Sequence, residues 1–502
     1  MPDQTDNRRF LTGESMMSAK LQDLILNYDP LAPDLRFADT ATEFAAALAA
    51  PKLPKPVPWP NGFAPFATAL DTSITGGPLP KCDVLVVTWT AAEARALATL
   101  FTPGVQIESW GRYTHKLADF IPKVTGLHAP FRGGLPMYHH VLGLFHPCQI
   151  GKANILCFKS GLHLDYDGPD MPVKDLWEQI IDETGASVVI TTGTAGGIGA
   201  NIMLGDVVIA EQVRFDCTTK FKNEPFNHSS YATGKLPADT FTHVTSALLE
   251  PNGDALNPIN TKLPRMLYSG SADVAHPVIV STDFFAYDDS NDTFGLQKLG
   301  NACEMGDAVL GLVMKDRGDT PLWVAIRNAS DPQIDGSLPK EQRDKVAGDI
   351  YKKYGLYTTV GSVIASWAVI RSTVAEAAIG ATPPPAMAAT IAAAFTPPPA
   401  PQPSPEAVLL AAVSADDAMI SPGVSPSPAD LAAFGNEAQR VGIDVLPAAV
   451  SWRGYAFTDE AGSRRELRLA NISQETGIGV FRGSYLFEAG RLVARQEFTG
   501  RG

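Results

Sequence analysis

Three short segments carry residues that can do acid–base chemistry or hold a ligand. Asp331 ends the strand-like stretch LWVAIRNASDP, where a carboxyl group can act as a general acid. Glu93 lies just after an apolar run, in the helix-forming segment TAAEARAL. The glycine-rich segment ITTGTAGGIG (190–199) lets backbone amides approach a ligand closely. Each also has a structural interpretation, as an Asx turn, a partner of the helix dipole or a tight turn.

Other motifs with known chemistry are missing or weak. No Gly-Lys-Ser/Thr follows the glycine-rich segment, and its spacing does not match G-x-G-x-x-G. The five cysteines contain no C-x-x-C pair, so neither a disulfide framework nor a cysteine zinc site is indicated. His139, His140, His146 and Cys148 lack the helical spacing typical of zinc ligands. We therefore expect neither a metal nor a cofactor.

The loop-like segment FKSGLHLDYDGPDMP (158–172) is a secondary candidate for the site. It follows a predicted strand and carries Lys159, His163 and several aspartates. Loops at strand ends often carry functional residues. We expect it to contribute less to the site than the three segments above.

Composition excludes several classes of partner. The 502 residues include 40 Lys and Arg against 54 Asp and Glu, a net charge of -14. A nucleic acid polymer would normally meet an excess of basic residues, so we expect none as partner. No run of 18 apolar residues is found, which predicts no membrane span, and MPDQTDNRRF lacks the apolar core of a signal peptide. Unpaired thiols and the missing signal indicate a cytoplasmic protein.

Strand-like and helix-like segments alternate through the central part of the chain. An unbroken apolar run such as CDVLVV (82–87) is typical of a strand buried on both faces. The alternation predicts an α/β fold, with a twisted, mostly parallel mixed sheet flanked by helices. Two helices, at 340–354 and 358–371, are expected to close this domain. Active sites of such sheets lie at the carboxyl ends of the strands.

Composition also divides the chain into four parts. Residues 372–439 contain no Lys or Arg and are rich in Ala, Pro and Ser, which is typical of a semi-rigid linker. Alternating polar and apolar residues near the end predict a small β-rich module. The expected parts are an N-terminal arm (1–80), the α/β domain (81–371), a Pro/Ala-rich linker (372–439) and the β-rich C-terminal module (440–502).

The order of the motifs resembles that of one enzyme superfamily. A Glu-bearing helix follows the first strand, and then come T-T-G-T-A-G-G, L-G-D-V-V, V-S-T-D-F-F, E-M and S-D. This order is similar to that of the nucleoside phosphorylase/nucleosidase superfamily, and most similar to that of methylthioadenosine/S-adenosylhomocysteine nucleosidases. The resemblance covers about residues 82–371.

The resemblance implies a role for ten residues. Glu93 stands where a carboxylate activates the attacking water. Asp331, after Ser330, stands where an acid protonates or hydrogen-bonds N7 of the leaving purine. Phe285 matches an aromatic residue that stacks on the purine. The other implied substrate-binding residues lie in the glycine-rich segment and around the E-M pair: Thr194, Ala195, Gly196, Glu304, Met305 and Asp307.

The implied activity is hydrolysis of the base–sugar bond in a purine nucleoside or a derivative of one. The substrate would be a small molecule, and we expect a homo-oligomer. An acid at the base and a carboxylate near the water address the two ends of that reaction.

Two departures from the pattern leave alternatives open. A second Glu after E-M would grip the ribose hydroxyls, but Gly306 stands there and an acid follows at Asp307. A shift of one helical residue turns a side chain by about 100°. Phosphorylases carry arginines where this chain has Thr191 and Glu93, which favours water as nucleophile. Arg95 keeps a purine nucleoside phosphorylase as the alternative, and a nucleoside- or nucleotide-binding sensor that has lost turnover is another.

Overall fold

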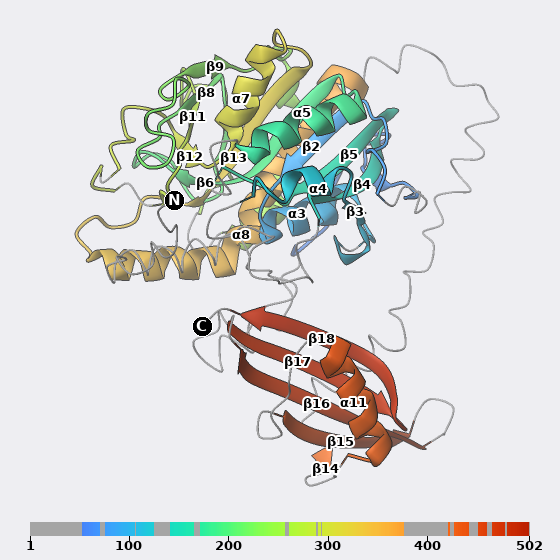
Figure 1. The fold of residues 1–502 in the computed structure, drawn as a ribbon. Helices are drawn as coiled ribbons and strands as arrows, with labels where there is room; N and C mark the ends of the chain where they lie inside the picture. The colour runs from blue at the N-terminus through green and yellow to red at the C-terminus, as the bar shows by residue number, and fades with distance from the viewer. Residues whose placement is uncertain are drawn as a thin grey trace, which may run out of the picture. The chain divides into compact units, whose positions relative to one another are not determined.

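The computed structural model describes residues 53–70, 76–105, 107–124, 141–164, 171–256, 261–287, 290–292, 294–375, 420–421, 426–440, 450–458, 464–476 and 479–500 (Figure 1). The chain divides into two compact units, Met1–Pro384 and Pro385–Gly502. Expectations for residues 1–52 and 376–419 lie outside the described residues. None of the helices in the described parts is long and apolar enough to cross a bilayer.

The first unit is built on one mixed sheet. Its strand order is β1-β4-β5-β2-β6-β12-β11-β8-β9, while β13 pairs with both β6 and β7. The central pairs β5–β2, β2–β6 and β6–β13 are parallel. The strands are β1 (Phe66–Ala67), β2 (Val84–Thr88), β3 (Gly111–Tyr113), β4 (Gly143–Ile150), β5 (Ala153–Ser160), β6 (Val188–Gly197), β7 (Val207–Ile209), β8 (Gln212–Phe215), β9 (Ser230–Ala232), β10 (Met266–Leu267), β11 (Val278–Ser281), β12 (Ala302–Glu304) and β13 (Leu322–Asp331).

Helices cover both faces of this sheet, so the predicted α/β fold is confirmed (Figure 1). All ten residues of β6 are buried, and alternate residues pack on opposite faces of the sheet. Val189 packs into the core beneath α5 (Pro172–Thr184) and α7 (Asp307–Asp316). Val188 and Ile190 pack into the core on the other face, beneath α3 (Ala91–Phe101), α6 (Ser246–Leu256) and α8 (Lys340–Ile370). The shorter helical elements are Ile107–Ser109, α4 (Leu117–Phe120), Thr240–His243 and Arg371–Ala375.

One edge of β6 changes partner along its length. On that edge β2 pairs with Val188–Thr191, and β12 pairs with Gly196 and Gly197. The opposite edge pairs with β13 from Val188 to Gly196. Residues 192–195 therefore lie in a gap between two strand partners. Ligands of open α/β sheets bind at such switch points.

The end of the first unit differs from the expectation of two helices. Residues 340–370 form the single helix α8, which runs through Gly355. A glycine inside a helix costs only about 1 kcal/mol relative to alanine. Here the Thr358 and Thr359 hydroxyls donate to the Gly355 carbonyl, at 3.0 and 2.9 Å. Burial of the following apolar turns, which include Val363 and Trp367, outweighs the glycine.

Residues 53–70 pack against α8. The Trp367 indole N–H donates to the Phe63 carbonyl at 2.7 Å, and the Trp59 and Trp367 rings lie 5.2 Å apart. β1, in the same segment, pairs with β4. This part of the N-terminal segment is thus tied to the first unit.

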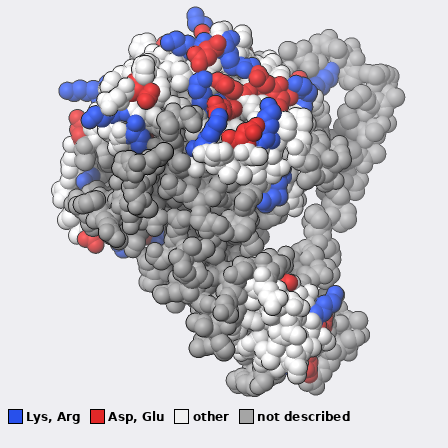
Figure 2. Space-filling model, in the orientation of Figure 1, with Lys and Arg blue, Asp and Glu red and all other residues white. Residues whose placement is uncertain are grey.

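Charged side chains of both signs are interspersed on the upper face of the first unit in Figure 2. Ion pairs on α5 and α7 include Lys174 with Glu178 at 2.6 Å and Arg317 with Asp182 at 2.8 Å. Exposed pairs of this kind contribute little to stability, since water screens them.

The second unit holds one antiparallel sheet in the order β14-β15-β16-β17-β18. Its elements are β14 (Ile420–Ser421), α11 (Pro428–Arg440), β15 (Val450–Thr458), β16 (Arg464–Thr476), β17 (Gly479–Glu488) and β18 (Arg491–Gly500). β14 and all but the last residue of α11 lie within 372–439, where the composition indicated a linker, so that expectation is corrected for these residues.

The residues that indicate a helix start at α11 are few, and the surrounding sequence is rich in Ala and Pro, which favoured the prediction of a linker. The Ser427 hydroxyl accepts from the Asp430 N–H at 3.1 Å and donates to the Asp430 carboxylate at 2.7 Å. Such reciprocal bonds favour the start of a helix. Phe434 then packs against Trp452 and Tyr485 of the sheet.

Candidate active site

A pocket with about 590 Å³ of open space, including its mouth, lies at the switch point of the sheet. It is lined by nine of the ten residues that the sequence singled out, and their roles remain predictions. The nine are Glu93, Thr194, Ala195, Gly196, Phe285, Glu304, Met305, Ser330 and Asp331.

The pocket wall also contains His163, from the secondary candidate segment, and six residues that the sequence did not indicate. The six are Trp89, Thr90, Thr282, Ala286, Cys303 and Arg327. Arg327 had a signal that was not used, since it is a charged residue inside the apolar strand LWVAIR. Buried charges are rare unless they are paired.

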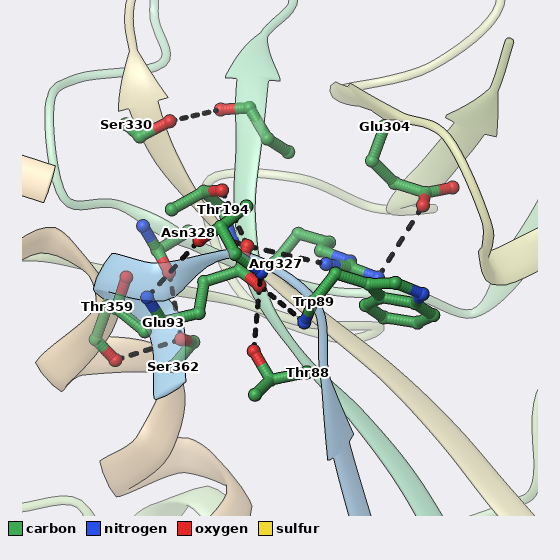
Figure 3. Close-up of polar contacts among 12 residues, drawn as sticks. Thr88, Trp89, Glu93, Thr194, Glu304, Arg327, Asn328, Ser330, Thr359 and Ser362 are labelled. Carbon is green, nitrogen blue, oxygen red and sulfur yellow. Dashed lines mark hydrogen bonds and ion pairs between the residues drawn. The ribbon is translucent and has the colours of Figure 1, made fainter. Parts of the chain in front are cut away.

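Glu93 crosses the gap beside β6 and is 1% exposed (Figure 3). It is the third residue of α3 and forms a capping box with Thr90. Its Oε2 accepts hydrogen bonds from the Thr88 hydroxyl at 2.7 Å and from the N–H groups of Trp89 and Thr90 at 2.8 Å. Its Oε1 accepts from the N–H and the hydroxyl of Thr194, both at 2.6 Å. The carboxylate thus fixes the unpaired edge of β6.

Gly193 allows Glu93 to come this close. A Cβ at residue 193 would lie 2.4 Å from Cδ of Glu93, and φ of Gly193 is +156°. Any other residue would meet both a steric clash and an unfavourable backbone conformation. Burial acts to raise the pKa of Glu93, but Arg327 and the hydrogen bonds from Thr194 and Thr90 outweigh it and lower that pKa. Glu93 is therefore an anion with low basicity.

Arg327, in the pocket wall, lies close to three carboxyl groups. It is 2% exposed. Its Nε and Nη2 donate to the two oxygens of Asp307, at 2.8 and 2.5 Å. Nη2 lies 3.5 Å from Glu304 Oε2, and Nη1 lies 4.0 Å from Glu93 Oε1. The guanidinium also stacks 4.6 Å from the Trp89 ring centroid. One buried positive charge is thus surrounded by three acidic groups.

The excess of acidic groups over basic ones affects the pKa of Glu304. Burial and the charge of Asp307 raise the pKa of Glu304 to about 8, although the charge of Arg327 acts to lower it. The Ser281 hydroxyl donates to Glu304 Oε1, and the Asp307 N–H lies 2.9 and 3.0 Å from its two oxygens. Glu304 therefore holds a proton near neutral pH, while Asp307 and Glu93 balance Arg327 and leave one excess negative charge.

Asp307 does not line the pocket, although the resemblance indicated a substrate-binding role. Its side chain is 0% exposed and points to Arg327. It is the first residue of α7, one position after Gly306. The rotation of about 100° per helical residue turns it away from the pocket.

Asp331 and Ser330 end β13 at the opposite side of the pocket. The register with β6 shifts between Ala329 and Asp331, so Asp331 pairs with Gly196. The Ser330 hydroxyl donates to Asp331 Oδ1 at 2.6 Å. Asp331 Oδ2 lies 3.0 Å from the place where a Cβ on Gly196 would be. The small residue at 196 thus gives the carboxyl group its room.

Phe285, backed by Tyr287, and the thioether of Met305 complete the wall. The rings of Phe285 and Tyr287 stack with centroids 5.7 Å apart and planes at 23°. Such a pair offers a flat apolar surface to a heterocyclic base. Met305 lies beside Glu304, and its carbonyl accepts from the Leu164 N–H at 3.3 Å.

The histidines and cysteines of the described residues do not gather with other ligands. Within those parts of the chain, no group of three or more His, Cys, Asp or Glu could hold a metal ion. His146 is buried and stacks 6.3 Å from Trp110. His139 and His140 lie outside the described residues.

Comparison with known proteins supports the superfamily. Residues 140–350 match the family model described as the phosphorylase superfamily. The resemblance of the motifs to this superfamily is thereby confirmed for residues 140–350. No match was found among curated proteins.

Solved structures similar to this chain include several nucleosidases. The methylthioadenosine/S-adenosylhomocysteine nucleosidase of Neisseria meningitidis, in complex with methylthio-immucillin-A, is 16% identical, with a TM-score of 0.34 and coverage of 58% of this chain and 98% of that one. The Helicobacter pylori nucleosidase of the same name is 14% identical, with a TM-score of 0.35 and coverage of 58% and 99%. The futalosine hydrolase of Helicobacter pylori is 13% identical, with a TM-score of 0.34 and coverage of 57% and 96%.

Proposed function

We propose that the first unit is an N-glycosidase that hydrolyses the base–sugar bond of a purine nucleoside or a nucleoside derivative. The observation that carries the proposal is the distribution of charge in the pocket. Asp331 lies on one side with the aromatic pair, and the acidic cluster around Arg327 lies on the other. A leaving purine needs a proton, and the sugar that it leaves becomes cationic.

Asp331 acts as the general acid in this proposal. We assign the transferred proton to the Asp331 carboxyl group, whose Oδ1 accepts from the Ser330 hydroxyl. The purine stacks on Phe285 and receives that proton at N7. The bond between the sugar carbon and the base nitrogen breaks, and its electron pair stays with the base.

Glu93 stabilises the sugar cation by its charge. Five hydrogen bonds reach its two oxygens, which together offer about four lone pairs. A carboxylate engaged in this way is a weak base, but its charge is fixed in place before the reaction. Activation of the attacking water by Glu93 stays a prediction. Water requires little activation when the sugar is already cationic.

Phosphate is disfavoured as the nucleophile. Arg327 is the one Arg or Lys among the described residues that line the pocket, and Asp307 occupies two of its donors. A phosphate near Glu93 would meet repulsion of about 4 kcal/mol per pair of unit charges at 4 Å, for an effective dielectric constant of 20. Arg95 is 4% exposed in α3 and is not among the lining residues. The phosphorylase alternative therefore has less support than hydrolysis.

The test is release of free base from a panel of purine nucleosides, with and without added phosphate. Hydrolysis yields free sugar, and its rate should not depend on phosphate. Accumulation of sugar 1-phosphate would identify a phosphorylase. Binding without release of base would identify a sensor.

Asp331→Asn tests the acid. It should retain the fold and lower turnover by about 10²–10⁴-fold, because asparagine cannot release a proton. Asp239→Asn is the matched control, since Asp239 is exposed and its side chain makes no capping bond. An Asp331→Asn protein with wild-type turnover would overturn the assignment.

A further inference from the structure

Gly306 lies beside the pocket wall, although it is not itself a lining residue. A Cβ there would lie 3.3 Å from Cζ2 of Trp89 and 3.6 Å from Oε2 of Glu304. Both neighbours line the pocket. At Gly306 φ is -172°, outside the left-handed region that favours glycine, and ψ is -27°. A Cβ there would lie tight against the Trp89 ring.

The carboxylates around Gly306 are engaged with the protein. Glu93 accepts five hydrogen bonds, as described above. Asp307 forms a two-pronged contact with Arg327. Glu304 faces the Ser281 hydroxyl, the Asp307 N–H and Arg327. Each of these three carboxyl groups is therefore already bonded to groups of the protein.

The wall beside Gly306 is aromatic and fixed in place. The Trp89 indole N–H donates to the Leu162 carbonyl at 3.0 Å. Its ring stacks on the Arg327 guanidinium and meets Trp177 edge-on, with centroids 6.0 Å apart. With its N–H occupied, the indole offers only apolar contact to a ligand. Met305 adds a second apolar surface.

We propose that this site recognises the sugar by apolar contact with Trp89 and Met305, and that it accepts purine 2′-deoxynucleosides at least as readily as ribonucleosides. This inference rests on the proposed function. A site built to bond a hydroxyl rejects the analogue without it by about 10⁴–10⁵-fold, whereas an apolar wall discriminates by about 10²-fold or less. A 2′-hydroxyl also withdraws electrons from the developing sugar cation, so the deoxy substrate has the lower intrinsic barrier.

The first test compares kcat/KM for adenosine and 2′-deoxyadenosine with the full-length protein. The deoxy substrate should match or exceed the ribo substrate. A preference for adenosine of more than about 10²-fold would overturn the inference and leave the proposed function intact. No base from either substrate would instead contradict the proposed function.

Two variants test whether residue 306 faces the sugar. Gly306→Glu supplies an acceptor beside Trp89 and should shift the kcat/KM ratio toward adenosine by about tenfold or more. Gly306→Ala is the matched control: its methyl group tightens the contact with Trp89, and both substrates should lose activity alike. Gly306→Gln serves if the added charge of glutamate prevents folding. A folded Glu or Gln variant with an unchanged ratio would overturn the inference.

Discussion

Replacement of Glu304 by glutamine should stabilise the protein at alkaline pH and have little effect at acid pH. Glutamine has the size of a protonated glutamate and cannot ionise. In the wild type, Glu304 is buried next to Asp307, and Arg327 is already held by that aspartate. Ionisation of Glu304 would therefore add an uncompensated charge to the core, and the variant removes that possibility.

The magnitude follows from the pKa of Glu304, which the fold raises from 4.5 to about 8. Each pKa unit corresponds to about 1.4 kcal/mol, so ionised Glu304 costs the folded state on the order of 5 kcal/mol. Between about pH 4.5 and about pH 8, Glu304 is protonated in the folded state and ionised in the unfolded chain. The stabilisation is therefore complete below about pH 4.5, falls as the pH rises, and is lost above about pH 8.

The assay is thermal and urea unfolding of the full-length protein and of Glu304→Gln at about pH 5 and about pH 9. The two proteins should unfold alike at the lower pH. At the higher pH the variant should gain on the order of 10 °C in melting temperature, at about 2–4 °C per kcal/mol for a domain of this size. Glu224→Gln is the control, since Glu224 is exposed. A variant that loses stability equally at both pH values would show that Glu304 is an anion required by Arg327.

Two further outcomes can be checked with the same preparations. Glu93→Gln should abolish base release, because it removes the charge beside the sugar. It should also lower the melting temperature, because the amide N–H₂ would face the backbone N–H groups that donate to the carboxylate in the wild type. Wild-type turnover in this variant would refute a role for the Glu93 charge. A chain that ends at Ala375 should release base at the rate of the full-length protein, since the lining residues of the pocket all precede that position; loss of the fold, measured by circular dichroism, would show that the second unit is needed by the first.

Much of the fold and most of the pocket could be predicted because their signals are local. Strands buried on both faces appear as apolar runs, as in Val84–Thr88. The glycine-rich segment of β6 indicated close approach, and Gly193 is indeed pressed against Glu93. Parallel strands end at the same edge of the sheet, so residues placed after strands were expected to meet there.

The features that the sequence did not yield depend on contacts between distant segments. Arg327 belongs to the site only because β13 lies beside β6 and α7 carries Asp307 to it. Local patterns cannot indicate such a pairing. Likewise, Gly355 breaks a helix by propensity, whereas burial of the α8 turns that follow it decides the outcome. The start of α11 depends on two side chains, Ser427 and Asp430, within a biased composition.

The switch point on β6 has a consequence for how the chain acquires its pocket during synthesis. The contact between Glu93 and Thr194 joins residues 101 positions apart, and the contact between Ala195 and Ser330 joins residues 135 positions apart. Closing such long loops is slow, since their entropy is lost before the contacts form. No partial chain that lacks β13 holds both ends of the pocket. A nascent chain is therefore unable to bind its ligand until its sheet is assembled, and bound ligand stabilises only the completed fold.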